Sequence, residues 1–308
     1  MWSIRFAMAG ISSIRDVLTA AATARLSLSA IMSAMREVVH YTVSEVEPYV
    51  NWLYFHHAWQ MNGKPLAERE MLRHDADQLL RRWEASFHTH AVVGLFEANS
   101  EGDDLIVGDL RLPLLRQQQP DPATGACLCL ADFVRPRTQG VKDRVGVFAA
   151  TVDPLMETMY DDDPYQRMLA QTLADRLAEA TAECLHEQVR RGLWGYAPDE
   201  QLTMEELHAE AFQGIRPAVG YPSLPDSSLN FLLERLIGMS EIGIRLTENG
   251  AMRPHASVSG LMLAHPEARY FSVGKIGDDQ LADYASRRGI PMALAYKFLA
   301  SNIFNTNK

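Results

Sequence analysis

Residues 163–191, DPYQRMLAQTLADRLAEATAECLHEQVRR, are the most strongly helical stretch of this 308-residue chain. Leucines recur at helical spacing along one side of it: Leu169, Leu173, Leu177 and Leu185. They predict a single apolar stripe on a helix about 40 Å long. Asp175, Glu179 and Glu183 recur every fourth residue and therefore share another face of the same helix.

Outward from this helix, strands and helices alternate irregularly. Apolar runs and alternation predict strands at 37–43, 92–96, 105–112, 128–134, 145–152, 243–248, 256–263 and 269–276. Helical spacing predicts helices at 50–61, 67–88, 204–212, 229–239 and from 278 onward. Because no steady βαβ rhythm is present, the pattern favours an α+β fold with a twisted, largely antiparallel sheet and flanking helices.

Two capping-box patterns mark predicted helix starts. Ser44-x-x-Glu47 precedes the helix at 50–61, and Pro48 is tolerated in a first turn. Thr203-x-x-Glu206 opens a short helix that is expected to end near Phe212.

Residues 1–34 differ in composition from the rest of the chain. They are rich in Ser, Ala and Arg, and Asp16 is their only acidic residue. This composition is typical of an organellar transit peptide, and it would also follow from an upstream start codon with Met35 as the true initiator. An ordinary surface helix is a third reading. We predict a leader or poorly ordered extension at 1–34 and one domain at 35–308.

Composition excludes several classes of function. The net charge of −10 disfavours non-specific binding to nucleic acid, which needs clustered cations. The sequence has no uncharged apolar run of about 18 residues, so it predicts no membrane-spanning helix. The odd number of cysteines (Cys127, Cys129 and Cys184) predicts a reducing compartment, the cytoplasm, and Cys127-x-Cys129 lacks the second ligand pair of a zinc site. Fingerprints for dinucleotides, P-loops, metalloproteases and nucleophile elbows are also absent, so we predict no metal site.

Residues 214–222, GIRPAVGYP, are the most constrained stretch. Two prolines fix the backbone, and Gly220 permits a shape that other residues resist. Arg216 offers a planar fork for a carboxylate or phosphate, and Tyr221 offers a stacking face and a hydroxyl. The segment therefore suits a small anion attached to a ring, although the residues alone favour a structural proline-rich turn with a surface arginine.

This segment resembles the R-P-A-x-G-Y-P signature of the S-adenosylmethionine-binding activation domain of cobalamin-dependent methionine synthase. Ordered matches accompany it from about residue 38 to about residue 300: Val92–Phe96, Cys129–Val134, Ala174–Ala180, Trp194–Pro198, Leu246–Glu248, Ala256–Gly260 and His265-Pro266. The resemblance implies a single C-shaped domain of that family.

The resemblance also implies roles for particular residues. Arg216 would hold the carboxylate of the ligand, while Ala218, Gly220 and Tyr221 would contact it through backbone and ring. Glu179 and Glu210 would lie near the positively charged sulfonium. The remaining implied contacts lie elsewhere in the sequence: Asn51, Tyr270 and Phe271.

Two of these positions depart from the family pattern. Asn51 stands where relatives usually carry an Asp, which keeps an acceptor but loses the charge, so weaker ligand binding is expected. Phe271 stands where relatives often carry a second Tyr.

For function, the resemblance implies presentation of the methyl group of S-adenosylmethionine to cobalamin carried by a partner methionine synthase polypeptide, with a flavodoxin-like reductant as electron donor. No residue of this chain is expected to be catalytic, and no turnover is expected from the chain alone. The alternative is a repurposed module that senses S-adenosylmethionine without methyl transfer, which Asn51 and Phe271 motivate. A hydrolase using Glu179 and Glu210 is disfavoured because those acids lack a nucleophile at readable spacing.

Overall fold

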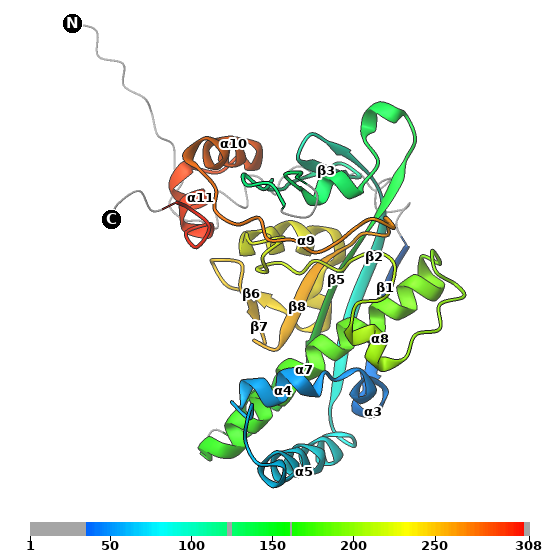
Figure 1. Ribbon diagram of the computed structural model, residues 1–308, viewed down its shortest axis with the longest axis vertical. Coiled ribbons are helices and arrows are strands. Elements are labelled where there is room, and N and C mark those ends of the chain that lie inside the picture. The colour runs from blue at the N-terminus through cyan, green and yellow to red at the C-terminus, as the bar shows by residue number, and fades with distance from the viewer. Residues whose placement is uncertain (1–34, 122–124, 161, 305–308) are drawn as a thin grey trace, which may run out of the picture.

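The computed structural model describes residues 35–121, 125–160 and 162–304, and the predicted leader at 1–34 lies outside these ranges. A six-stranded antiparallel sheet forms its centre, in the order β4-β3-β2-β5-β8, with β1 also paired to β2 (Figure 1). The strands are β1 (Met35–Thr42), β2 (His88–Glu101), β3 (Asp104–Val107), β4 (Leu110–Pro113), β5 (Asp143–Val152) and β8 (Ser257–Met262). The predicted α+β class with a largely antiparallel sheet is confirmed.

The long strand β2 organises the sheet, because β1 and β3 share one of its edges while β5 pairs along the other. Its side chains alternate between two hydrophobic cores. Val92 faces one core and Val93 the other, as the two-residue period of a strand requires. Both faces of the central strands are therefore buried, and helices cover each of them.

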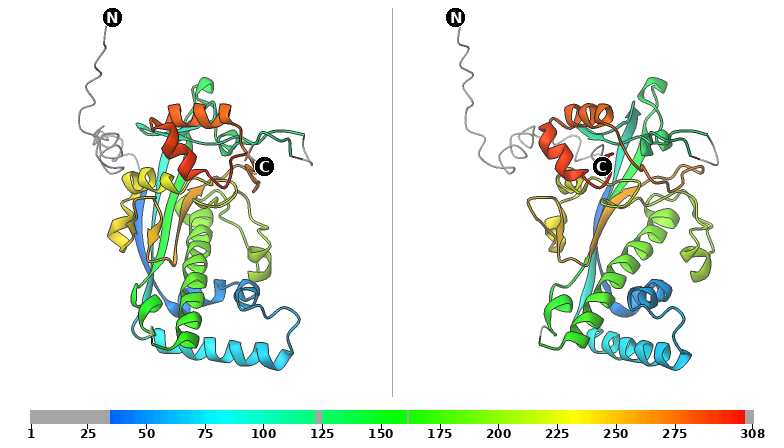
Figure 2. Two further views of the ribbon diagram at one scale, coloured as in Figure 1. Left: turned by 90° about the vertical axis from the view of Figure 1, so that its left-hand side faces the viewer. Right: turned by 60° about the vertical axis from the view of Figure 1, so that its left-hand side comes forward.

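The predicted long helix is α7 (Pro164–Gln188), which begins at the N-cap Asp163 and continues into a π-helical turn at Val189–Leu193. It crosses one face of the sheet diagonally, and its leucine stripe joins the core that contains Val93 (Figure 2). α9 (Asn230–Ile237) covers the opposite face. The sheet thus lies between α7 and α9, and the charged face of α7 is free to build a site.

The remaining helices lie around these layers. They are α3 (Val43–Val46), α4 (Trp52–Ala58), α5 (Leu66–Trp83), α6 (Leu155–Thr158), α8 (Met204–His208), α10 (Asp278–Arg288) and α11 (Met292–Phe298). A small hairpin of β6 (Arg245–Leu246) and β7 (Met252–Arg253) adds a second sheet. Within the described ranges, no helix has the length and apolarity needed to cross a membrane.

Several local predictions were wrong. The strand predicted at 105–112 is two strands, β3 and β4, which pair as a hairpin because the chain turns at Gly108, whose φ is +58°. The N-terminal capping box is Thr42 with Glu45 rather than Ser44 with Glu47, because β1 runs directly into α3 and Thr42 becomes the N-cap. Residues 128–134 form a 3-10 helix at Leu130–Phe133 instead of a strand, since Asp132 accepts a hydrogen bond from the backbone N–H of Cys129.

The segment at 269–276 is also not a strand. Its backbone is tied to loops: Ser223 Oγ both donates to the carbonyl of Phe271 and accepts from its N–H, and Val273 N–H donates to the carbonyl of Pro222. These partners are isolated bonds to a turn, so no strand ladder forms there. The capping box at Thr203 is confirmed, although α8 ends at His208 rather than near Phe212.

Candidate ligand pocket

The segment 215–219 runs beside β8 and is held there by backbone hydrogen bonds. Ile215 and Leu263 exchange both of their N–H···O bonds at 2.9 Å, Leu261 N–H donates to Pro217 at 3.0 Å, and Val219 N–H donates to Ser259 at 2.8 Å. Pro217 takes part only as an acceptor, so its missing N–H costs nothing here. The signature segment is therefore an irregular edge on a rigid sheet.

Two glycines permit this close approach. A Cβ at Gly260 would lie 2.2 Å from the carbonyl oxygen of Pro217, and one at Gly214 would lie 2.4 Å from that of Leu263. Gly214 also has a φ of +83°, which disfavours other residues. Any side chain at either position would push the segment carrying Arg216 away from the sheet.

Arg216 is the only basic side chain that lines the cavity described below, and it lies between α7 and the signature segment. Its Nη1 and Nη2 donate to the same oxygen, Oε2 of Glu183, at 3.2 and 3.0 Å. The guanidinium also lies 6.0 Å from the centre of the Phe148 ring on the sheet. Burial alone would lower the pKa of Arg216. The negative charge of Glu183, with further contributions from Tyr270, Glu179 and Glu210, outweighs burial, so the pKa is raised and the guanidinium stays charged.

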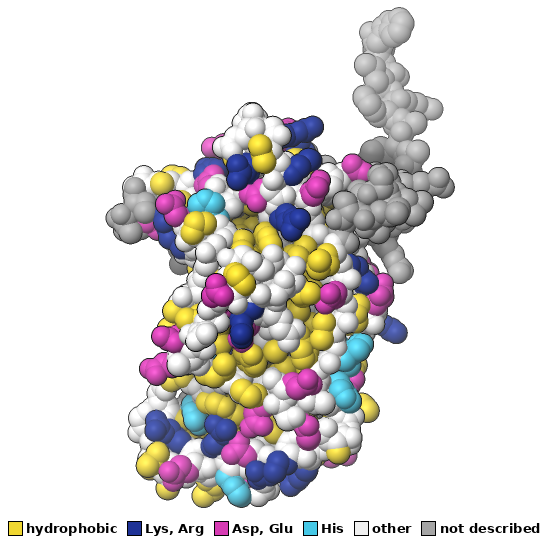
Figure 3. Space-filling view, turned by 90° about the vertical axis from the view of Figure 1, so that its right-hand side faces the viewer, with side chains coloured by type: hydrophobic (Ala, Val, Ile, Leu, Met, Phe, Trp, Pro, Cys, Tyr) yellow, Lys and Arg dark blue, Asp and Glu magenta, His cyan; other side chains and the backbone are white. Residues whose placement is uncertain are grey.

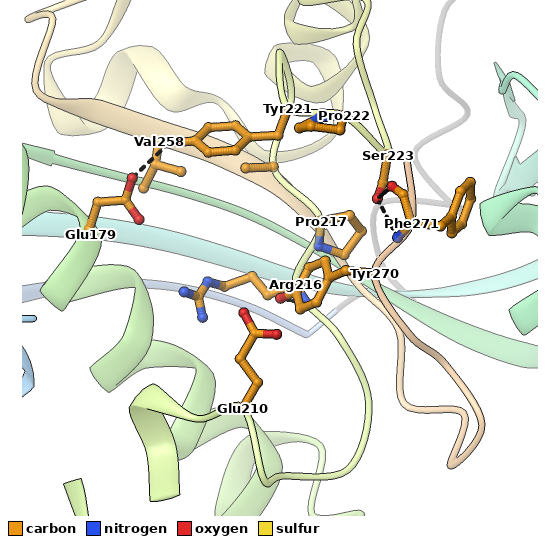
Figure 4. A pocket seen from close by; sticks show the side chains of 11 residues that line it. Glu179, Glu210, Arg216, Pro217, Tyr221, Pro222, Ser223, Val258, Tyr270 and Phe271 are labelled. Atoms are coloured by element: carbon orange, nitrogen blue, oxygen red, sulfur yellow. Dashed lines mark hydrogen bonds between the residues drawn. The ribbon is translucent and has the colours of Figure 1, made fainter. Parts of the chain in front are cut away.

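Two tyrosines line the same cavity as Arg216. The hydroxyl of Tyr270 accepts a hydrogen bond from the backbone N–H of Arg216 at 2.9 Å. Tyr221 donates to Oε1 of Glu179 at 2.8 Å, a contact drawn as a dashed line in Figure 4. Burial raises the pKa of both hydroxyls, and Glu179 adds to the effect at Tyr221, so both remain protonated at neutral pH.

Glu210 lies in the loop after α8 and lines the same cavity as Arg216. Its φ of +57° is left-handed, a conformation that side chains other than Gly, Asn and Asp adopt rarely. Figure 4 shows its carboxylate directed toward the guanidinium of Arg216. Burial raises the pKa of Glu210, and the nearby Arg216 offsets part of that rise. A strained backbone thus delivers a partly desolvated acid to the pocket.

These side chains surround a cavity of about 420 Å³, a size suited to a small organic ligand. Its walls are Glu179, Glu210, Arg216, Pro217, Ala218, Tyr221, Pro222, Ser223, Val258, Tyr270 and Phe271. On the face of the molecule that Figure 3 shows, hydrophobic side chains gather in the middle, with charged side chains above and below them. The pocket therefore combines an apolar wall with one guanidinium and two carboxylates.

Most residues singled out from the sequence meet in this cavity: Glu179, Glu210, Arg216, Ala218, Tyr221, Tyr270 and Phe271. The ring of Phe271, however, belongs to the hydrophobic core and is drawn turned away from Arg216 (Figure 4). Gly220 forms the turn behind the wall, with a φ of +90° and its N–H bonded to the carbonyl of Leu224.

Asn51 is not among the lining residues. It is the N-cap of α4, where its side-chain oxygen accepts hydrogen bonds from Leu53 and Tyr54. The sequence analysis assigned no ligand contact to four further lining residues, Pro217, Pro222, Ser223 and Val258, nor any role to Glu183, which pairs with Arg216. For Glu183 a signal was present, because it lies one helical turn beyond Glu179 on the same face of α7.

The arrangement suits binding rather than acid–base chemistry. Its cation is held by one carboxylate, and two further carboxylates face the same space, so a ligand carrying both negative and positive charge is accommodated. In the described part of the chain, no group of three or more His, Cys, Asp and Glu side chains is placed to hold a metal ion.

Comparison with known proteins agrees with this architecture. The family model for the vitamin B12 dependent methionine synthase activation domain matches residues 42–289. A solved structure described as the MetH reactivation domain bound to AdoHcy is similar in fold, with a TM-score of 0.83 and 36% sequence identity over 87% of this chain and 90% of that chain. Since the family match spans more than half of the sequence, the chain belongs to the activation-domain family of vitamin B12 dependent methionine synthase.

Proposed function

We propose that the pocket around Arg216 binds S-adenosylmethionine and presents its methyl group to cobalamin carried by a partner methionine synthase polypeptide. One observation carries this proposal: a protein 36% identical to this chain, with the same fold, was solved with AdoHcy bound. AdoHcy is the demethylated form of S-adenosylmethionine, so the two share the nucleoside and the amino-acid tail.

The pocket residues fit such a ligand in charge and shape. Arg216 is suited to the carboxylate of the amino-acid tail, through a charge-assisted pair. Glu179 and Glu210 supply negative charge for the sulfonium and the ammonium. The rings of Tyr221 and Tyr270 give apolar surface for the nucleoside, and the backbone at Ala218 and Gly220 shapes the wall.

The role of this chain in methyl transfer would be positioning. The bound sulfonium supplies the methyl group, and the reduced corrinoid of the partner supplies the electron pair that accepts it. The pocket residues would orient the ligand and hold its charges, which lowers the entropic cost of bringing two large reactants together. We assign no side chain here as a general acid, base or nucleophile.

Reconstitution tests this function. The chain would be mixed with a cobalamin-loaded methionine synthase polypeptide, a flavodoxin-like reductant and S-adenosylmethionine labelled in its methyl group. We expect label to appear on the corrinoid only when all components are present. Methyl transfer to a small acceptor without any corrinoid protein would contradict the proposal, and ligand binding without transfer would favour a sensing module.

A further inference from the structure

Glu183 contacts Arg216 in an unusual way for a buried ion pair. The side chains are 12% and 14% exposed for Arg216 and Glu183, respectively, so both are largely removed from water. Only one carboxylate oxygen takes part, and it accepts from both Nη atoms. The other oxygen, Oε1, is buried and has no hydrogen-bond partner within the described residues.

The contact with Glu183 occupies one edge of the Arg216 guanidinium and leaves the N–H donors of another edge unused. Arginine carries five N–H groups in a planar fork, and the bond to Glu183 occupies the edge between the two Nη atoms. Within the part of the chain that the structure describes, Nε of Arg216 donates to no side chain or carbonyl. The edge between Nε and one Nη therefore remains for a second, bidentate carboxylate.

Glu183 itself does not line the cavity, whereas Arg216, Glu179 and Glu210 do. A carboxylate that served to block Arg216 would bind it with both oxygens, since the bidentate pair is the stronger form. The single-oxygen contact restrains the guanidinium and does not use all of its hydrogen-bond donors.

We propose that Glu183 is a positioning residue, which holds Arg216 end-on so that its Nε edge selects ligands carrying a free carboxylate. The inference rests on the proposed function, because it assumes that an S-adenosyl amino acid occupies the pocket. It adds that selectivity for the amino-acid tail depends on a residue that the ligand does not touch.

Two ligands separate this role from a general effect on folding. S-adenosylhomocysteine carries the amino-acid tail, and 5′-methylthioadenosine is a closely related nucleoside without it. Their affinities would be measured by calorimetry for the wild type, Glu183→Gln, Glu183→Asp and a control, Glu187→Gln. Glu187 lies one turn further along α7 and bonds Tyr49 and Arg191 instead of Arg216.

We expect Glu183→Gln to lose about tenfold in affinity for S-adenosylhomocysteine, the size of one charge-assisted hydrogen bond. Its affinity for methylthioadenosine should change by less than about twofold, because that ligand makes no use of the Nε edge. Glu183→Asp keeps the charge on a shorter side chain and should recover part of the preference, and Glu187→Gln should retain all of it.

Other outcomes overturn the inference. Equal losses for both ligands would make Glu183 a structural residue only, and tighter binding of S-adenosylhomocysteine to Glu183→Gln would make it a competitor. If the wild type binds neither ligand, the proposed function fails and this inference fails with it. If the wild type prefers the tailed ligand and Glu183→Gln keeps that preference, the inference alone fails.

Discussion

Two buried arginines, Arg190 and Arg216, lie beside the second half of α7 and differ in how many hydrogen bonds the protein makes to them. Arg190, in the π-helical turn, is fully buried and makes three hydrogen bonds of 2.6–3.0 Å to both oxygens of Glu200. Its guanidinium also lies 4.2 Å from the ring centre of Phe212. Arg216 receives a single oxygen from Glu183 and borders a cavity.

A buried histidine, His186, lies near enough to both arginines for their charges to affect its pKa. His186 is completely buried, and its pKa is well below the ordinary value because burial, Arg216 and Arg190 all disfavour a further positive charge. It therefore stays neutral near the two cations. The charge of Arg190 is neutralised by Glu200, and we expect this pair to stabilise the fold. Arg216 keeps unused hydrogen-bond donors, which we expect to bind a ligand.

The strongest way to test the structural half of this comparison is to remove the partner of Arg190. Glu200→Ala leaves an uncompensated buried charge, so the free energy of unfolding should fall by about 3–5 kcal/mol. Urea denaturation followed by circular dichroism measures it. A loss below about 1 kcal/mol would mean that Arg190 finds other partners and that the two arginines are less different than described.

The next test exchanges each arginine for lysine. Arg216→Lys keeps the charge but loses the planar fork, so affinity for S-adenosylhomocysteine should fall by about 1.5–3 kcal/mol with little change in stability. Arg190→Lys should do the reverse and lower stability more than affinity. Calorimetry measures the affinity of both variants, and thermal unfolding measures their stability. If the two substitutions lower affinity and stability alike, the proposed difference between Arg190 and Arg216 is wrong.

Glu210 offers a test in which stability and binding move in opposite directions. Glu210→Gly relieves the left-handed backbone, so the free energy of unfolding should rise by about 1 kcal/mol while affinity for S-adenosylmethionine falls. Glu210→Ala is the control, because it removes the carboxylate and keeps the strain. Equal stability of the two variants would show that the positive φ costs nothing.

The pH dependence of binding follows from the raised pKa of Glu210. Below that pKa the carboxyl is neutral, and above it the negative charge favours the sulfonium of S-adenosylmethionine over the neutral sulfur of S-adenosylhomocysteine. The affinity ratio of the two ligands should therefore rise with pH in a window that begins near the ordinary value of 4.5 and extends above it. In Glu210→Gln the same titration should be flat, and a ratio that still rises would point to another group.

The smallest expected effect concerns Asn51. Asn51 does not line the cavity, but the family resemblance implies a ligand contact there. Asn51→Asp adds a negative charge at the start of α4 and should tighten binding of S-adenosylmethionine by about 1 kcal/mol, the difference between a neutral and a charged hydrogen bond. As a helix N-cap, Asp serves as well as Asn, so stability should change little. Unchanged or weaker binding in calorimetry would restrict Asn51 to its capping role.

Local sequence patterns were sufficient for the elements that depend on local physics. The leucine stripe of α7, the apolar strand β5 and the capping box at Thr203 all need only neighbours in sequence. The apolar run at 128–134 did not become a strand, because Asp132 accepts from the N–H of Cys129 and is held in turn by Arg116 from another loop. Long-range partners of this kind leave no periodic signal.

The pocket was predictable only in part. The spacing of Glu179 and Glu183 on one face of α7 was readable, but their meeting with Arg216, Glu210 and Tyr270 depends on how the signature segment docks on β8. Gly260 makes that docking possible because it lacks a Cβ, which would lie 2.2 Å from the carbonyl oxygen of Pro217, and no spacing rule reveals this. The family resemblance, rather than periodicity, brought the distant residues together.

A crystal structure of this chain with S-adenosylhomocysteine would test the central claim most directly. We predict that the ligand carboxylate lies within hydrogen-bonding distance of the Nε edge of Arg216, with Glu183 still bound to both Nη atoms. A ligand seated elsewhere, or one whose carboxylate points away from Arg216, would contradict it.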